Sequence, residues 1–97
     1  MQHIGIEKIN ERGETLQRSD VNFVDIIVNL YKVNDYKEKF PLLSYIDPYG
    51  DTYFNMLQKQ DLIRELENFN FDKNLTNKVI NFIKNAKDLE YIKFIGD

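Results

Sequence analysis

The chain has 97 residues and a formal net charge of −3, and 42% of its residues are hydrophobic. This length supports one hydrophobic core, and the composition is that of a folded domain rather than a disordered chain. The modest acidity argues against general nucleic-acid binding. Because cysteine is absent, disulfides, thiolate zinc sites and cysteine nucleophiles are excluded.

Signals for export and for cofactors are missing as well. The N-terminal residues do not place a basic stretch before an apolar one, and no apolar run approaches the roughly 20 residues of a membrane span. The sequence contains no phosphate-binding loop, no dinucleotide-binding glycine motif and no zinc-protease motif. We therefore expect a cytoplasmic protein with no membrane segment, no cofactor and no metal ion.

The first third of the chain predicts a hairpin followed by a helix. Residues 4–9 are β-rich, 10–13 form a turn, and 14–17 return as a short polar edge strand. Residues 21–33 are largely apolar, but their polar residues recur at helical spacing, which predicts a helix with Ser19 or Asp20 as its N-cap. Residues 34–39 are predicted to form a charged linker.

The stretch 41–55 predicts a second hairpin. Asp47, Pro48 and Gly50 occupy the first, second and fourth positions of a type I turn, with Gly50 expected in the left-handed conformation of a bulge. In that register Asp47 lies opposite Asp51, and Tyr45 lies opposite Tyr53. Opposed carboxylates are mildly unfavourable, which hints at a function for the pair.

The last part of the chain predicts two helices and a strand. Residues 57–69 and 75–87 are amphipathic, with Asn55 and Asn74 as expected caps, and the short break between them predicts an antiparallel pair. Residues 89–95 are apolar on both faces, as in an interior strand that pairs with 4–9 or with the second hairpin. The whole chain, 1–97, is thus expected to be a single α+β domain, a mostly antiparallel sheet of two hairpins and a C-terminal strand covered by about three helices.

The second hairpin carries the candidate binding residues, which are Tyr45, Asp47, Tyr49, Asp51 and Tyr53, with Tyr36 nearby. Exposed tyrosines supply large, rigid contact area at protein interfaces. In the structural alternative, Asp47 caps the turn, Asp51 is solvated, and Tyr45 and Tyr53 pack as a pair under a helix. The spacing of the two aspartates does not match a calcium loop.

Two further groups of residues could carry chemistry. His3 is the only histidine, and no cysteine or G-x-S-x-G serine accompanies it, so catalysis by His3 is not expected. Lysines 73, 78, 84 and 87 give the stretch 73–87 a charge of +4 without an acidic residue, which could attract an anionic partner. A solvated helix face explains the same pattern.

The segment 45–52 together with Phe54, Asn55, Leu57 and Gln58 resembles a signature associated with small uncharacterised bacterial proteins, and the ending at 94–97 is similar to theirs. This resemblance covers about a quarter of the chain at the level of motifs. It implies a bacterial origin and no activity.

The functional hypothesis is therefore a non-enzymatic protein-binding module, of the immunity or inhibitor type, that acts through the 45–53 surface on another protein. One alternative is a small-molecule binder or an acid/base enzyme that uses Asp47 and Asp51 in a pocket. Another is a regulator that contacts nucleic acid through the lysine-rich helix 73–87.

Overall fold

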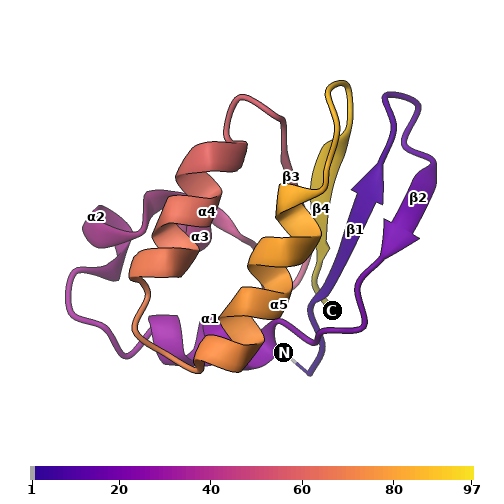
Figure 1. Cartoon of the computed structure of the whole chain (residues 1–97). Coiled ribbons are helices and arrows are strands. Elements are labelled where there is room, and N and C mark those ends of the chain that lie inside the picture. Colours follow the sequence, from indigo (N-terminus) through magenta and orange to yellow (C-terminus); the bar gives the residue numbers. More distant parts are fainter. Residues whose placement is uncertain (1) are drawn as a thin grey trace.

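The computed structural model describes residues 2–97, and it confirms the α+β class with an antiparallel sheet. In this part of the chain the strands are β1 (Gly5–Ile9), β2 (Thr15–Arg18), β3 (Asp51–Phe54) and β4 (Tyr91–Ile95). The helices are α1 (Val24–Leu30), α2 (Tyr36–Lys39), α3 (Pro41–Tyr45), α4 (Lys59–Asn68) and α5 (Lys73–Lys84). The sheet order is β2-β1-β4-β3, and the helices lie together on one face of the sheet (Figure 1).

The first hairpin and the C-terminal strand are confirmed. β1 pairs with β2 through a turn in which Gly13 donates its N–H to the Asn10 carbonyl and adopts a φ of 84°. β2 is exposed along its whole length, as expected of a polar edge strand. β4 lies between β1 and β3 and pairs antiparallel with both, so each of the two predicted pairings occurs.

Alternation along the strands separates an inner face from an outer face. Ile92 and Phe94 of β4 point to the helices and are fully buried, together with Phe54 of β3. The ring of Phe94 lies 4.9 Å from that of Phe23 and 5.8 Å from that of Phe54, measured between centroids. These three rings form the aromatic centre of the core.

A row of polar side chains crosses the outer face of the sheet. The register places Tyr53, Lys93, Glu7 and Arg18 side by side on four successive strands. Glu7 is only 6% exposed, because its carboxylate is held by Arg18 at 2.7 Å and by the hydroxyl of Thr15 at 2.9 Å. Glu7 is paired with Arg18, and Lys93 lies 3.7 Å from the carboxylate of Asp51, so the charged side chains of this row each have a partner of opposite charge.

The predicted helices form, with differences at their ends. α1 is shorter than predicted, and the predicted N-caps Ser19 and Asp20 are wrong, since the Asn22 side chain accepts the N–H of Val24 and also that of Ile4. The predicted linker 34–39 contains the short helix α2. No helix within residues 2–97 is long and apolar enough to cross a membrane.

α4 and α5 are the amphipathic pair predicted for the second half of the chain, and they run in opposite directions (Figure 1). The predicted cap Asn74 is wrong. Asp72 caps α5 instead, because its carboxylate accepts the N–H groups of Asn74 and Leu75. Ahead of α4, the predicted cap Asn55 accepts the N–H groups of residues 57 and 58, although the helix begins only at Lys59.

The second predicted hairpin is wrong. Residues 41–45 form helix α3 instead of a strand, so β3 has no hairpin partner and Tyr45 does not face Tyr53 across a ladder. Pro41 sits at the start of α3, where its fixed φ suits a helix. The carboxylate of Glu65, from α4, accepts the N–H groups of Leu42 and Leu43 at 3.0–3.1 Å. This tertiary cap favours a helix over the strand that local preferences indicate.

We expect Glu65→Ala to lower the free energy of unfolding by about 1–2 kcal/mol, because two N–H groups of α3 lose a charged acceptor. Urea denaturation measures the change. Glu67→Ala is the matched control, since Glu67 lies on the same helix and is exposed. Equal effects of the two substitutions would contradict the capping role of Glu65.

Candidate functional site

The turn that was predicted around Asp47 is confirmed in part. Gly50 donates its N–H to the carbonyl of Asp47 at 3.4 Å, and the Asp47 carboxylate accepts the N–H of Tyr49 at 2.9 Å. The prediction that Gly50 adopts the left-handed conformation is wrong, because among the described residues the glycine with a positive φ is Gly13. A Cβ at Gly50 would lie 2.7 Å from a carboxylate oxygen of Asp47, so a larger residue there would displace the Asp47 side chain from its place in the turn.

The turn is joined to the sheet by two contacts. Thr52 is buried on the inner face of β3, and its hydroxyl accepts the N–H of Asp47 at 2.9 Å. Gly96 donates its N–H to the Gly50 carbonyl at 2.8 Å, and a Cβ at Gly96 would lie 2.4 Å from the backbone of Pro48. The turn is therefore held against the end of β4 as well as against β3.

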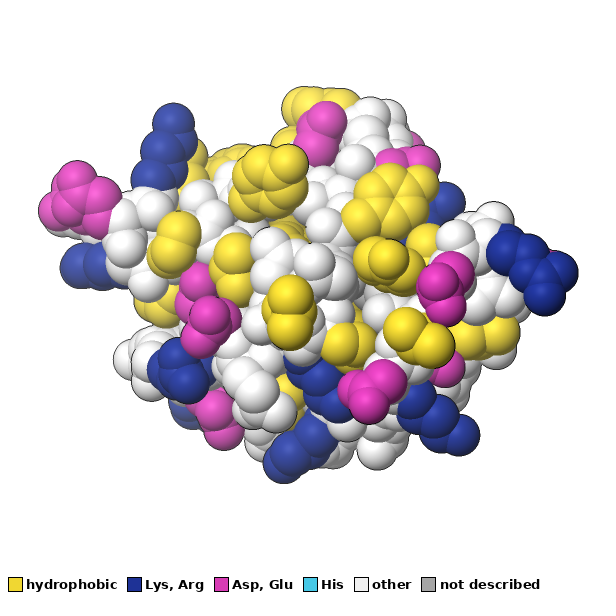
Figure 2. All heavy atoms as spheres, turned by 90° about the horizontal axis from the view of Figure 1, so that it is seen from above, with side chains coloured by type: hydrophobic (Ala, Val, Ile, Leu, Met, Phe, Trp, Pro, Cys, Tyr) yellow, Lys and Arg dark blue, Asp and Glu magenta, His cyan; other side chains and the backbone are white. Residues whose placement is uncertain are grey.

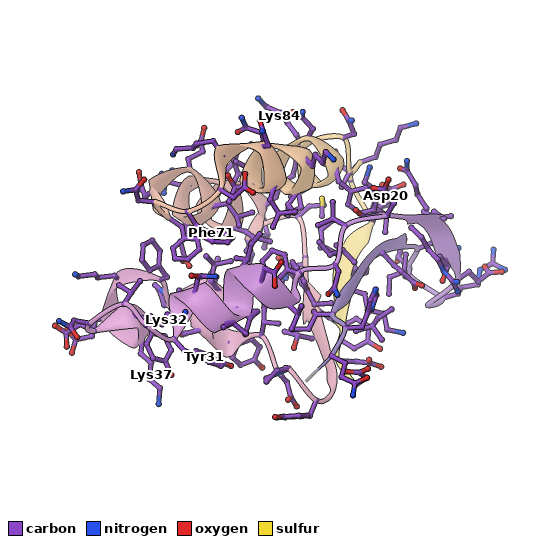
Figure 3. The ribbon with its side chains drawn as sticks, turned by 90° about the horizontal axis from the view of Figure 1, so that it is seen from below. Asp20, Tyr31, Lys32, Lys37, Phe71 and Lys84 are labelled. Carbon is purple, nitrogen blue, oxygen red and sulfur yellow. The ribbon has the colours of Figure 1, made fainter. Side chains whose placement is uncertain are left out.

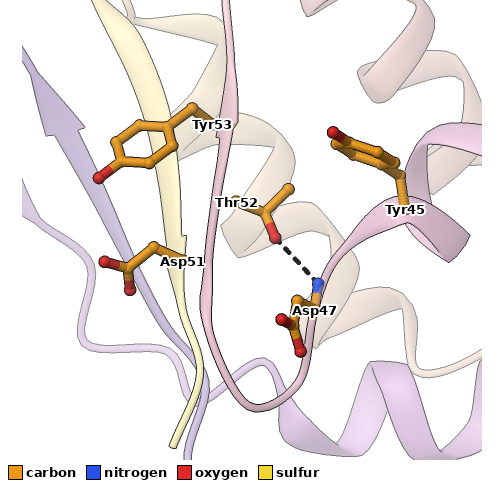
Figure 4. Close-up of a pocket in the computed structure, with 5 residues that line it drawn as sticks. All are labelled: Tyr45, Asp47, Asp51, Thr52 and Tyr53. Atoms are coloured by element: carbon orange, nitrogen blue, oxygen red, sulfur yellow. Dashed lines mark hydrogen bonds between the residues drawn. The ribbon is translucent and has the colours of Figure 1, made fainter.

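A groove of about 420 Å³ opens between β3 and the segment that leaves α3. It is lined by Tyr45, Asp47, Asp51, Thr52 and Tyr53. Figure 4 shows Tyr45 across the groove from β3, Asp47 at its turn end, and the side chains of Asp51 and Tyr53 directed over β4. Four of the five predicted site residues thus line one groove, although not in the predicted register.

The tyrosines around the groove are exposed. Tyr45, Tyr49 and Tyr53 are 71%, 67% and 50% exposed, so the structural alternative, in which Tyr45 and Tyr53 pack beneath a helix, is wrong. Tyr49 does not line the groove; it stands beside it on the turn, where its backbone rather than its ring contacts Asp47. On the face seen from above, hydrophobic side chains lie among charged ones (Figure 2).

Each aspartate has a defined environment. Asp47 caps the turn, as the structural alternative predicted. Asp51 is not merely solvated, because one of its carboxylate oxygens lies 3.7 Å from the ammonium group of Lys93. The same ammonium group lies 5.6 Å from the centre of the Tyr53 ring. Asp51 and Tyr53 therefore already hold a cationic side chain, which shows the chemistry that this side of the groove favours.

Two more tyrosines extend the surface. Tyr31, at the end of α1, has its pKa raised by burial first, then by the nearby Tyr36, Tyr49 and Asp47. Its ring lies 5.3 Å from that of Tyr36. Figure 3 shows Tyr31 close to α2. Sequence reasoning missed Tyr31, because nothing local links α1 to a turn that lies far along the chain.

The other candidate groups lie elsewhere. The exposed lysines of 73–87 lie along and just beyond α5, and Figure 3 shows Lys84 on the opposite side of the molecule from Tyr31. Among residues 2–97, no group of three or more His, Asp or Glu side chains could hold a metal ion. His3 is exposed near the N-terminus, where its N–H and that of Gln2 donate to Asp97 and thereby lower the pKa of that carboxyl.

One lysine is buried outside the candidate site. Lys8 points to the helices and is buried, and this burial lowers its pKa while the nearby Glu90 raises it. Its ammonium group donates to Gln17 at 3.0 Å and lies 4.4 Å from the centre of the Phe82 ring. These contacts satisfy the charge, so Lys8 has a structural role between β1 and α5.

The chain was compared with protein-family models, curated proteins and solved structures, and none of them matches it.

Proposed function

We propose that this protein is a protein-binding module of the immunity or inhibitor type, whose binding surface is the groove beside β3 with its surrounding tyrosines. The observation that carries the proposal is the exposure of Tyr45, Tyr49 and Tyr53 around one groove. Exposed tyrosine rings leave a large apolar surface in contact with solvent, and such rings are frequent anchors in protein interfaces.

The charges of the groove support a basic partner. Asp47 and Asp51 line it, and the chain as a whole is acidic, with a net charge of −3. Complementary charge speeds association and selects against acidic competitors. A module of this kind would act by covering a basic surface of its partner and blocking that surface from other molecules.

An acid/base role for the aspartates has less support. The Asp47 carboxylate is engaged by the turn, and the Asp51 carboxylate is paired with Lys93. Neither histidine nor a third carboxylate accompanies them in the groove lining. The arrangement suits recognition of a cation better than proton transfer.

We expect Tyr49→Ala to abolish partner binding while the melting temperature stays within about 2 °C of the original, because the contact of this residue with Asp47 uses its backbone N–H. Asp51→Ala should weaken binding too, at a cost of at most about 1 kcal/mol in stability for its partly exposed ion pair. Affinity capture from the source cell with mass spectrometry, followed by titration of the purified partner, measures both.

Leu57→Ala is the matched control for this experiment. Leu57 is 91% exposed and belongs to the loop ahead of α4, away from the groove lining. Its loss removes a similar exposed apolar side chain without touching the proposed surface. Partner binding that survives Tyr49→Ala and Asp51→Ala, or that falls equally with Leu57→Ala, would refute the proposal.

A further inference from the structure

The hydrogen-bond pattern of the sheet shows which backbone groups of β3 face outward. Gly50 and Gly96 lie opposite each other, one step beyond the Asp51–Ile95 pair, and Gly96 donates its N–H to Gly50. Bonded and non-bonded pairs alternate along an antiparallel ladder. Thr52 therefore bonds to β4, whereas the N–H and C=O groups of Asp51 and Tyr53 point away from the sheet.

The opposite edge of the sheet leads to the same assignment. Ser19 donates its N–H to the Ile6 carbonyl, so Ile6 belongs to a bonded pair of the β1–β2 ladder. Because the bonded pairs alternate, the N–H and C=O groups of Glu7 face β4 instead, where Glu7 forms a bonded pair with Lys93. The next residue of β4, Phe94, is left to bond Thr52 on β3. The outward direction of the Asp51 and Tyr53 backbone groups thus follows from two independent hydrogen bonds.

These outward groups border the groove. None of the residues 2–97 forms a hydrogen bond with the backbone N–H or C=O of Asp51 or Tyr53 on this side. Local sequence preferences predicted a strand at 42–46 beside them, but Glu65 draws that segment into α3. The groove of about 420 Å³ lies where the hairpin partner was expected, with Tyr45 as its far wall.

The two edges of the sheet differ in their protection against strand addition. β2 is interrupted by an irregular register opposite Lys8 and Ile9 and carries Arg18. Bulges and cationic side chains are common devices against pairing with other chains. β3 reads Asp-Thr-Tyr-Phe, with no proline, no bulge and no lysine or arginine. Its single charge is negative, which repels acidic segments and attracts basic ones.

We propose that a basic, extended segment of the partner protein adds to the free edge of β3 as a further strand. Backbone hydrogen bonds to Asp51 and Tyr53 hold the segment, and a lysine or arginine side chain pairs with Asp47 and Asp51. The Tyr45 ring covers the added strand from the α3 side. This inference rests on the proposed function and specifies its mode of binding.

The probe is a phage-displayed library of random hexapeptides, selected on the whole protein, with the best sequence then synthesised and titrated. We expect selected peptides that alternate basic and β-branched residues. Binding to Tyr53→Pro should be at least about fivefold weaker than to Tyr53→Ala, because both variants lack the ring and only the first lacks the outward N–H. The sheet should tolerate proline at residue 53, because the N–H group of Tyr53 takes no part in the β3–β4 ladder.

Amide hydrogen exchange of the unmodified protein tests the same point without a substitution. In the free protein, the amides of residues 51 and 53 should exchange much faster than those of residues 52 and 54. Saturation with the selected peptide should slow the amide exchange of residues 51 and 53 at least about tenfold. Unchanged exchange at these two amides, or equal peptide binding by Tyr53→Pro and Tyr53→Ala, overturns strand addition.

The outcomes separate this inference from the proposed function. If Tyr49→Ala abolishes partner binding but amides 51 and 53 stay unprotected, the module binds through its side chains and strand addition is wrong. If the peptide protects both amides but Tyr49→Ala leaves partner binding intact, the proposed surface is wrong and the edge remains a peptide site. If the protein sediments as a dimer and the Tyr53→Pro variant sediments as a monomer, the strand that adds to β3 comes from a second copy of this chain. That result would overturn the proposal of a basic partner segment.

Discussion

Replacing Phe94 with alanine is expected to lower the free energy of unfolding by about 3–5 kcal/mol. Phe94 is fully buried at the centre of the sheet, between the rings of Phe23 and Phe54. Its removal leaves a cavity that the surrounding strands and α1 fill only in part, because each is fixed by its own contacts. Chemical denaturation followed by circular dichroism measures the loss.

The control for this variant is Ile95→Ala, the next residue of β4. Ile95 points to the outer face and is partly exposed, so its truncation should cost clearly less. A difference in this direction supports the assignment of the inner and outer faces of β4. Similar losses at residues 94 and 95 would show that both faces of the strand are packed.

Gly96→Ala is expected to lower the free energy of unfolding by about 1–3 kcal/mol and to displace the turn at residues 47–50. A Cβ at residue 96 would lie 2.4 Å from backbone atoms of Pro48, which cannot move aside as the end of a side chain can. The turn has to shift, and the hydrogen bond from Gly96 to Gly50 weakens with it. Amide chemical shifts of residues 47–52 report the displacement, and partner binding should fall with it.

Gly5→Ala provides the same chemical change at a tolerant position. Gly5 lies on β1 opposite Ile95, and a Cβ there meets only the His3 side chain, at the ordinary distance of 3.6 Å. An alanine in a strand also loses less conformational entropy on folding than glycine. We expect Gly5→Ala to be neutral or slightly stabilising, and a loss equal to that of Gly96→Ala would contradict the steric argument.

Patterns of local hydrophobicity were sufficient for most of the fold. The alternation in 4–9 and the doubly apolar stretch 89–95 predicted an edge hairpin and an interior strand, and both occur. The helical spacing in 57–69 predicted α4, whose inward residues Leu62, Ile63 and Leu66 are buried. Such patterns are reliable because a strand or helix must turn its apolar side to the core wherever it packs.

Helix caps were predicted less well, because a cap depends on one side chain and one N–H group. Asp72 rather than Asn74 caps α5, which moves its start by two residues. At α1 the N-cap position is held by Phe23 rather than by Ser19 or Asp20, and it has no side-chain cap; the Asn22 side chain just before it accepts the N–H groups of Val24 and of Ile4 on an adjacent segment. Several residues near each helix start have suitable side chains, and contacts with distant segments select among them.

In the stretch 41–55, local sequence preferences predicted the turn but not the structure of the segment before it. The residues of the turn were enough to predict that Asp47 caps it, and its carboxylate accepts the N–H of Tyr49, because this interaction lies within the four residues of the turn. They were not enough to predict the segment before it. Local preferences favour a strand at 42–46, but the carboxylate of Glu65, about twenty residues away, supplies the acceptors that a helix needs at its start.

For the candidate binding surface too, the sequence predicted which residues belong to it, and only the tertiary structure determined how they are arranged. The candidate binding residues within 45–53 could be predicted from composition and turn chemistry, since tyrosines and aspartates near a turn tend to be exposed. Their arrangement follows from long-range contacts, since β3 pairs with β4 instead of with 42–46 and Lys93 comes to lie near both Asp51 and Tyr53. The open edge of β3 exists for the same reason, because pairing partners are chosen by the packing of the whole core and not by neighbours in the chain.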